Sequence, residues 1–253
     1  MKSTLFLFSF LLFCGTSIAQ KKEYSKEELQ SLNEYYFNEG FVNPSTKKVS
    51  TINLKDGTEI RGYVQRVRTK KFQIRSIILK DSVSQDKLDL DASYIAEAYL
   101  FGSEFDKHFK MIDQVERAGT GQRKSMRKII ASDEIYFVNK SVSLKNKKEN
   151  QEFLLQLINP DFDRYIAVYY DPAARETSGA NLGGLKLGGG VIQSYYIEKG
   201  DRVLWLRKKD FKKHYEFLFG DNPEFMEQYP VKSAKWEWLS ALILEYSKMQ
   251  SAT

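Results

Sequence analysis

The sequence predicts an α+β protein in which an N-terminal β-rich small barrel is followed by a mixed sheet covered by C-terminal helices. Three observations lead to this prediction. Short alternating apolar segments with tight turns run from residue 48 to 102. Further strand patterns follow after residue 130, and the chain ends in apolar residues at helical spacing.

The composition is that of a globular chain with a sizeable core. Of the 253 residues, 42% are hydrophobic, 28% are charged and 14% are aromatic, and there is one cysteine. These values differ from those of a disordered tail, a collagen or a disulfide scaffold.

Residues 1–19 have the pattern of a cleaved signal peptide. Lys2 precedes a ten-residue apolar run that ends at Cys14, and a small-x-small cleavage site ends at Ala19. The run is too short to span a bilayer, which needs about 20 apolar residues. We therefore expect an exported, periplasmic or extracellular protein that begins at Gln20 and has no transmembrane span.

Lipid attachment at Cys14 is the alternative to cleavage. We favour cleavage because Phe13 is not the small residue expected before a lipidated cysteine. Cleavage removes Lys2 and the only cysteine, so that 38 basic residues remain against 33 acidic ones, a net charge of +5. A chain without a thiol has no thiol nucleophile, no cysteine zinc site and no disulfide.

Two less regular segments flank the predicted barrel. Residues 20–47 are polar, and Ser25 and Glu28 match a capping box that predicts a helix over residues 25–36. Residues 103–129 are predicted as a helical and basic connector.

The barrel itself is predicted from five strands. They lie at residues 49–54, 60–67 and 72–79, around Leu88 and Leu90, and at residues 94–101. Tight turns join them, and closure into a barrel removes exposed strand edges. Residues 52–64, with a turn at Asp56-Gly57 and a kink at Gly62, resemble the first hairpin of SH3-like and Sm-like small barrels.

Residues 130–253 are predicted as an α+β domain. Strands are expected at residues 135–138, 141–144 and 165–170, with a hairpin formed by residues 191–197 and 202–206, and helices at residues 149–158, 210–219 and 233–249. The last helix carries an apolar stripe that we interpret as its core face, made of Trp238, Leu239, Leu242, Ile243, Tyr246 and Met249.

The sequence lacks the usual catalytic and cofactor motifs. The glycine-rich segment 179–190, which includes Gly183 and Gly184, is not a nucleotide P-loop, because Leu187 stands where the magnesium-binding hydroxyl belongs. Only two histidines, His108 and His214, are present, without metal-site spacing, and no Gly-x-Ser-x-Gly follows the signal segment. We therefore expect no cofactor and no metal.

Three aspartates leave one enzymatic alternative open. Asp161, Asp163 and Asp171 are candidate carboxylates for a hydrolase that acts on extracellular or envelope carbohydrate. The alternative interpretation of Asp161 and Asp163 is that they stabilise the turn after Pro160.

Basic residues gather in three clusters. The first lies on the predicted hairpin and comprises Arg66, Arg68, Lys70, Lys71 and Arg75; the others are residues 123–128 and 207–213. Such clusters favour an anionic partner. Because export argues against nucleic acid, we expect an anionic polysaccharide, a lipid headgroup or an envelope protein.

The signal segment and the block from Ser125 to Asp221 resemble a family of exported proteins of Bacteroidota. The resemblance lies in Phe-Val-Asn-Lys-Ser at residues 137–141, Tyr-Tyr-Asp-Pro at 169–172 and Ser-Tyr-Tyr at 194–196. It implies export and brings no activity or catalytic residues.

The sequence thus predicts a non-catalytic binding or interaction module of the cell envelope. Its expected surface combines the basic hairpin with Tyr170 and the loop from residue 171 to 190, which includes Asp171, Gly183 and Gly184. The carboxylate-dependent hydrolase is the alternative.

Overall fold

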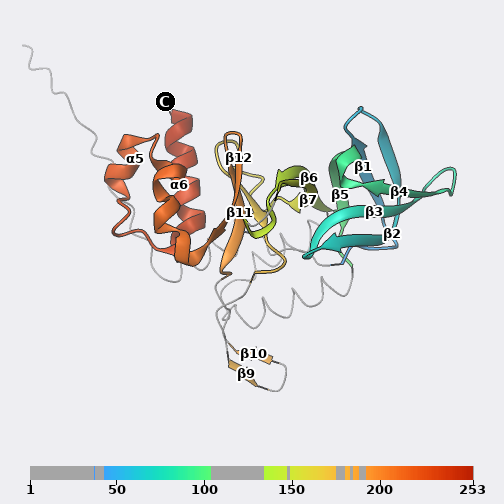
Figure 1. The fold of residues 1–253 in the computed structure, drawn as a ribbon, viewed down its shortest axis with the longest axis horizontal. Helices are drawn as coiled ribbons and strands as arrows, with labels where there is room; N and C mark the ends of the chain where they lie inside the picture. The colour runs from blue at the N-terminus through green and yellow to red at the C-terminus, as the bar shows by residue number, and fades with distance from the viewer. Residues whose placement is uncertain are drawn as a thin grey trace, which may run out of the picture.

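A computed structural model describes residues 37, 43–103, 134–146, 149–174, 180–182, 185–187 and 192–252, the two short stretches 180–182 and 185–187 by their backbone only. The predicted α+β class is confirmed. A small barrel, a three-stranded sheet and a group of helices stand in a row along the long axis of the molecule (Figure 1). The signal segment, the helix predicted over 25–36 and nearly all of the connector 103–129 lie outside the described residues.

All five strands predicted for the barrel are present. They are β1 (Val49–Leu54), β2 (Glu59–Lys70), β3 (Gln73–Asp81), β4 (Lys87–Asp91) and β5 (Ile95–Phe101). Every pairing between them is antiparallel, and the 3-10 turn η1 (Ala92–Tyr94) leads from β4 into β5. Alternation and turn residues predicted these strands well because one face of each lies against the barrel core.

Two later strands close the barrel. These are β6 (Glu134–Val142) and β7 (Gln151–Gln156), which pair with each other and insert between β5 and β3. The order β2-β1-β5-β6-β7-β3 becomes a ring of six strands through the β2–β3 pairing, and β4 continues the sheet beside β3. The sheet of the barrel therefore includes strands that the sequence assigned to the second unit.

The predicted helix over residues 149–158 is wrong, because this segment forms β7. The run Phe153-Leu154-Leu155 is buried on both sides of the strand. Leu154 belongs to the barrel core, whereas Phe153 and Leu155 belong to a second core between the barrel and the three-stranded sheet. A strand buried on both faces loses the alternation that marks strands in sequence.

The two strands predicted at residues 135–138 and 141–144 are one continuous strand, β6. Asn139 and Lys140 do not form a turn. The Asn139 amide donates to the carbonyl of Ala92, and the Lys140 ammonium pairs with Glu198. Both polar side chains are therefore paired while the backbone continues as a strand.

Gly62 permits the close approach of β2 to β3. A Cβ atom at this position would lie 2.3 Å from the carbonyl oxygen of Lys80, which no side chain tolerates. The glycine expected to kink the second strand thus serves tight packing between strands.

The second sheet has the order β12-β11-β8, with β8 (Ala167–Tyr170), β11 (Ser194–Lys199) and β12 (Arg202–Arg207). The predicted hairpin is confirmed, although β11 begins at Ser194 rather than Val191. One face of the sheet packs on the barrel and the other on the helices. Two short strands, β9 (Ala180–Leu182) and β10 (Leu185–Leu187), pair with each other within the glycine-rich segment.

An asparagine side chain covers part of the outer edge of β12. The Asn146 amide donates to the carbonyl of Trp205 at 2.9 Å, and the Trp205 N–H donates to Asn146 Oδ1 at 3.1 Å. Asn146 and Lys145 reach this position in left-handed conformations, in the 3-10 turn η2 (Leu144–Asn146). The side chain takes the place that a neighbouring strand would occupy.

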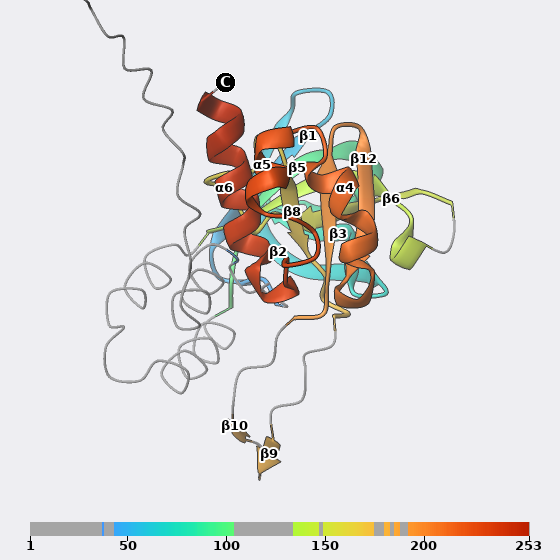
Figure 2. The ribbon, with the colours of Figure 1, turned by 90° about the vertical axis from the view of Figure 1, so that its left-hand side faces the viewer.

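The helices cover the face of the second sheet that points away from the barrel and stand in front of the strands in Figure 2. They are η3 (Lys208–Asp210), η4 (Lys212–His214), α4 (Tyr215–Phe219), α5 (Pro223–Gln228), η5 (Trp236–Trp238) and α6 (Leu239–Ala252). The predicted helix 210–219 is thus two 3-10 turns followed by one short helix, and the predicted helix 233–249 starts at Leu239. Among the described residues, no helix is both long and apolar enough to cross a membrane.

The predicted core face of the last helix is confirmed. Leu239, Leu242, Ile243 and Tyr246 are buried against the second sheet and α5. Sequence patterns missed α5, whose start carries recognisable signals: the Asn222 side chain accepts from the Phe225 N–H, and a proline follows the cap.

Candidate binding surface

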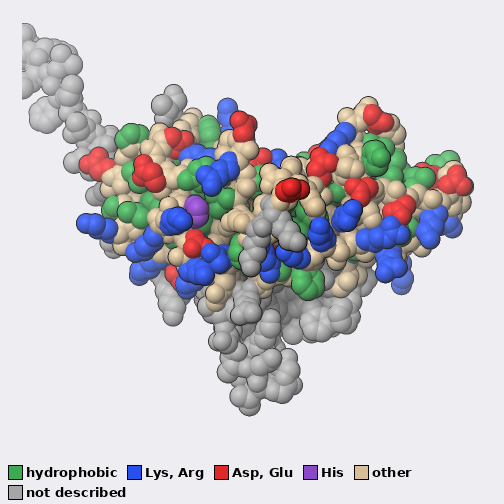
Figure 3. Space-filling model, viewed as in Figure 1, with side chains coloured by type: hydrophobic (Ala, Val, Ile, Leu, Met, Phe, Trp, Pro, Cys, Tyr) green, Lys and Arg blue, Asp and Glu red, His purple; other side chains and the backbone are tan. Residues whose placement is uncertain are grey.

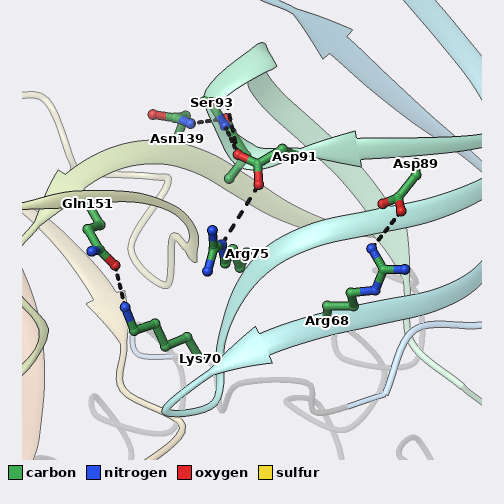
Figure 4. A network of polar contacts seen from close by, with 9 residues as sticks. Arg68, Lys70, Arg75, Asp89, Asp91, Ser93, Asn139 and Gln151 are labelled. Atoms are coloured by element: carbon green, nitrogen blue, oxygen red, sulfur yellow. Dashed lines mark hydrogen bonds and ion pairs between the residues drawn. The ribbon is translucent and has the colours of Figure 1, made fainter.

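The basic hairpin, defined as Arg66, Arg68, Lys70, Lys71 and Arg75, lies at the end of the barrel where β2 turns into β3 (Figure 4). Lys70 pairs with Gln73, so that Lys71 and Phe72 alone form the turn. Both have positive φ, 49° and 70°. A two-residue turn with positive φ at both positions matches the right-handed twist of the flanking strands.

Two of the five cations have acidic partners. Arg68 forms an ion pair with Asp89 at 2.6 Å, and the Arg75 Nε lies 3.8 Å from an Asp91 oxygen. Asp89 and Asp91 belong to β4, which pairs with β3, so that the carboxylates reach across from the neighbouring strand. Both pairs are solvent-exposed, and such pairs are worth about 0 to 1 kcal/mol.

The other three cations keep an uncompensated charge. The Lys70 ammonium donates to the neutral side-chain carbonyl of Gln151 at 2.6 Å. Within the described part of the chain, the exposed side chains of Arg66 and Lys71 have neither an ion pair nor a hydrogen bond. Five cations against two carboxylates leave the basic hairpin with a net charge of 5 − 2 = +3.

Asp91 stays ionised at neutral pH. Burial works to raise its pKa, but hydrogen bonds from the Ser93 N–H and hydroxyl, together with the charge of Arg75, outweigh it and lower the pKa. The carboxylate is therefore charged at neutral pH and acts as a counter-charge to Arg75.

The structure brings the basic hairpin next to the start of the glycine-rich loop. Gln73, at the first position of β3, is only 3% exposed, and its amide donates to the carbonyl of Tyr170 at 3.4 Å. The hairpin and Tyr170 are thus neighbours, as the predicted surface requires. Gly183 and Gly184 lie outside the described residues.

Asp171, which was also predicted to belong to this surface, points into the protein. It is 1% exposed, and one carboxylate oxygen accepts hydrogen bonds from the Ser194 hydroxyl and the Trp205 indole N–H, both at 2.7 Å. The other oxygen accepts from the Ala173 N–H at 3.0 Å. This side chain stabilises the junction of three strands and presents no charge to a ligand.

The three candidate carboxylates do not gather at one place. Asp171 contacts Ser194, at the first position of β11, whereas Asp163 interacts electrostatically with Glu198 near the other end of that strand. Ser194 and Glu198 are themselves roughly 13 Å apart along β11, at about 3.3 Å per residue. Burial, reinforced by Glu198, raises the pKa of Asp163. Asp161 is exposed.

Sequence patterns missed a network of tyrosines and carboxylates beside the second core. Glu97 accepts from the Tyr136 hydroxyl at 2.6 Å and from the Asn53 amide at 2.9 Å. Glu198 pairs with Lys140 at 2.7 Å and accepts from the Tyr169 hydroxyl. Its members come from five strands and share no spacing in sequence, so no motif could reveal them.

This network is a structural feature of the seam between barrel and sheet. Both oxygens of each carboxylate already accept from a protein donor. Burial raises the pKa of Tyr136 and Tyr169, so that both hydroxyls remain protonated. Among the described residues, no group of three or more metal-ligating side chains is placed to hold an ion.

The basic cluster at residues 207–213 is paired to the same extent as the basic hairpin, because two of its five cations have acidic partners. Figure 3 shows Lys and Arg side chains over the barrel and again over the helices. On the helical side, Lys208 pairs with Glu237 at 2.6 Å and Arg207 with Asp210. His214 is half-buried there, and burial together with nearby Arg202 lowers its pKa.

Of the predicted site residues, the structure therefore joins the basic hairpin with Tyr170 and separates Asp171 from them by burial. The cluster 123–128 lies outside the described residues. Comparison of the chain with protein families, curated proteins and solved structures finds no match.

Proposed function

We propose that the protein is an exported, non-catalytic binding module of the cell envelope that holds an anionic partner on the basic hairpin. The observation that carries the proposal is the uncompensated charge of Arg66, Lys70 and Lys71 beside two exchangeable surface ion pairs. An anionic ligand is attracted by all three uncompensated cations, and it has to displace only two weak surface ion pairs.

The place of action follows from the signal pattern of residues 1–19, and the resemblance to exported proteins of Bacteroidota supports it. In an exported protein, the anionic partners at hand are envelope polysaccharide and lipid headgroups. The small-barrel scaffold supplies a rigid base for the hairpin, as in the SH3-like and Sm-like barrels that its first hairpin resembles.

The hydrolase alternative lacks comparable support. Asp171 is buried and accepts hydrogen bonds from Ser194 and Trp205, and Asp161 is exposed at the surface. A glycosidase needs two carboxyl groups about 5 to 10 Å apart that face one substrate.

The test is binding of a soluble polyanion, dextran sulfate, and of vesicles that contain phosphatidylglycerol. Replacing Arg66 and Lys71 together by serine should weaken both interactions about tenfold or more, since each lysine or arginine near an anionic surface contributes about 1 kcal/mol. Binding should also weaken steeply with added salt, because exposed charges are screened over about 8 Å.

The matched control replaces Lys209 and Lys213, two exposed cations on the helical side, by serine and removes the same total charge. It should bind nearly as well as the wild type. Equal losses in both double variants would show that net charge alone matters, and salt-insensitive binding would contradict the electrostatic mechanism.

A further inference from the structure

Phe72 is the one aromatic side chain of the basic hairpin, and it points into solvent. Its side chain is 65% exposed at the tip of the turn, directly after Lys71. A bulky residue with φ of 70° is an outlier, because the left-handed region favours glycine and asparagine. The chain thus keeps an apolar ring in water and in an unfavourable backbone conformation.

The base of this turn is fixed to the rest of the molecule. Lys70 is tied to Gln151, and the buried Gln73 is tied to the carbonyl of Tyr170. These contacts connect both flanking residues of the turn to β7 and to the end of β8. Phe72 therefore projects into solvent from a turn whose base is hydrogen-bonded to neighbouring strands.

Val83 and Tyr94 are the other large hydrophobic residues that are exposed in the described part of the chain, and the surroundings of Phe72 differ from those of Val83. Val83 is 89% exposed on the β3–β4 turn, where the Asp81 carboxylate accepts from the Val83 N–H. Hydrogen bonds from the backbone of Ser84 and Val83 lower the pKa of Asp81, which keeps that turn negatively charged. Phe72 instead has cations on both sides of it along the hairpin.

An aromatic tip surrounded by cations matches the boundary of an anionic bilayer, where an apolar group enters the interface and basic groups meet phosphates. We propose that Phe72 inserts into the headgroup region of a membrane that contains anionic phospholipid, while Arg66, Lys70 and Lys71 contact the phosphates. This inference rests on the proposed function and selects a lipid surface over a polysaccharide. A hydrated anionic polysaccharide also offers negative charge to the cations, but it has no apolar phase into which the phenyl ring could be transferred from water.

The experiment compares Phe72→Ser with Val83→Ser in the full chain. Sedimentation with vesicles of phosphatidylcholine and phosphatidylglycerol should show about a tenfold or greater loss of affinity for Phe72→Ser and no loss for Val83→Ser. Both variants should keep wild-type binding to dextran sulfate, because neither removes a charge. Thermal unfolding checks that both are folded.

A second measurement reports insertion directly. Phe72→Trp should show fluorescence quenching by phosphatidylglycerol vesicles with brominated acyl chains, above that of the wild type, and Val83→Trp should show no such increase. Vesicle binding by Phe72→Ser equal to the wild type, or equal quenching of both tryptophan variants, would overturn the inference.

The outcomes also separate this inference from the function on which it rests. Binding of dextran sulfate without binding of anionic vesicles would leave a polyanion-binding module and refute membrane insertion. Binding of neither would refute both.

Discussion

Asp171 links the three strands of the second sheet through one buried carboxylate. It follows β8, and its oxygens accept from Ser194 on β11 and from Trp205 on β12. A buried carboxylate with several donors is held firmly, and its removal leaves those donors without partners. The residue that sequence patterns marked as a candidate ligand or acid is thus used for stability.

We expect Asp171→Ala to lower the free energy of unfolding by about 2 to 4 kcal/mol, because the Trp205 indole and the Ser194 hydroxyl lose their acceptor in a buried place. Urea denaturation measures the change. Asp201→Ala, in an exposed turn, should cost no more than about 0.5 kcal/mol. Similar small losses in both would show that the carboxylate is not buried as described.

Glu97 should give the protein a pH-dependent stability. Hydrogen bonds from Tyr136 and Asn53 lower its pKa below the ordinary value of 4.5. A carboxyl group with a lower pKa in the folded chain contributes stability above its unfolded pKa, and that contribution is lost as the pH falls through the folded pKa.

Tyr136→Phe removes the largest of these influences. The stability difference between wild type and variant should therefore be greatest above about pH 4.5 and shrink at lower pH. Denaturation at a series of pH values tests this, and NMR titration of Glu97 should show its pKa rise in the variant. A difference that is constant with pH would contradict the assignment.

The conformation of the β2–β3 turn lowers the stability of the fold, because its two residues have left-handed backbone conformations. Lys71 and Phe72 adopt a geometry that asparagine and glycine prefer. Replacing the pair by Asn-Gly should raise the free energy of unfolding by about 1 to 2 kcal/mol, because left-handed backbone is costly for ordinary residues. Thermal and urea unfolding measure it, with Lys71→Ala as a control that keeps a side chain at the strained position.

The more stable Asn-Gly variant should at the same time lose vesicle binding. A variant that is no more stable than the wild type would show that the turn is not strained.

Strand and helix prediction succeeded where one face of an element meets a single core. Asp56-Gly57 and the alternation around it identified β1 and β2, and the stripe with Leu239 and Tyr246 identified α6. The prediction of secondary structure failed at β7, where Leu154 faces the barrel core and Phe153 and Leu155 face the second core. No local pattern reports that a segment lies between two cores.

The candidate surface was predictable for a similar reason. Residues 66–75 lie on one hairpin, so adjacency in sequence gives adjacency in space. The neutralising role of Asp89 and Asp91 depends on the pairing of β4 with β3. The inward turn of Asp171 depends on Trp205, a residue from another strand. Contacts between distant segments cannot be read from spacing.

Three cores follow one another through the molecule, within the barrel, between barrel and sheet, and between sheet and helices. Because β6 and β7 close the barrel, residues 43–103 contain only four of the six strands of the ring. Whether the two predicted units unfold separately stays a prediction.

We expect the isolated segment 43–103 not to fold. β5 would expose an unpaired edge, β3 would lose its pairing with β7 at Ile74, and the barrel core would lack Ile135, Phe137 and Leu154. The longer segment 43–156 supplies the missing strands and should show dispersed amide signals and a cooperative transition. NMR spectra and urea unfolding of both compare them. A cooperatively folded 43–103 would refute the requirement for closure.

The asparagine that covers the edge of β12 also affects whether copies of the protein associate at high concentration. Through its two hydrogen bonds to Trp205, Asn146 fills a position at which the sheet of one molecule would otherwise recruit a strand from the next. Binding to a membrane, as proposed above, would concentrate the protein in two dimensions, and pairing between sheet edges becomes more favourable as the local concentration rises. One side-chain amide would therefore help to keep neighbouring copies separate in the membrane-bound state that we propose.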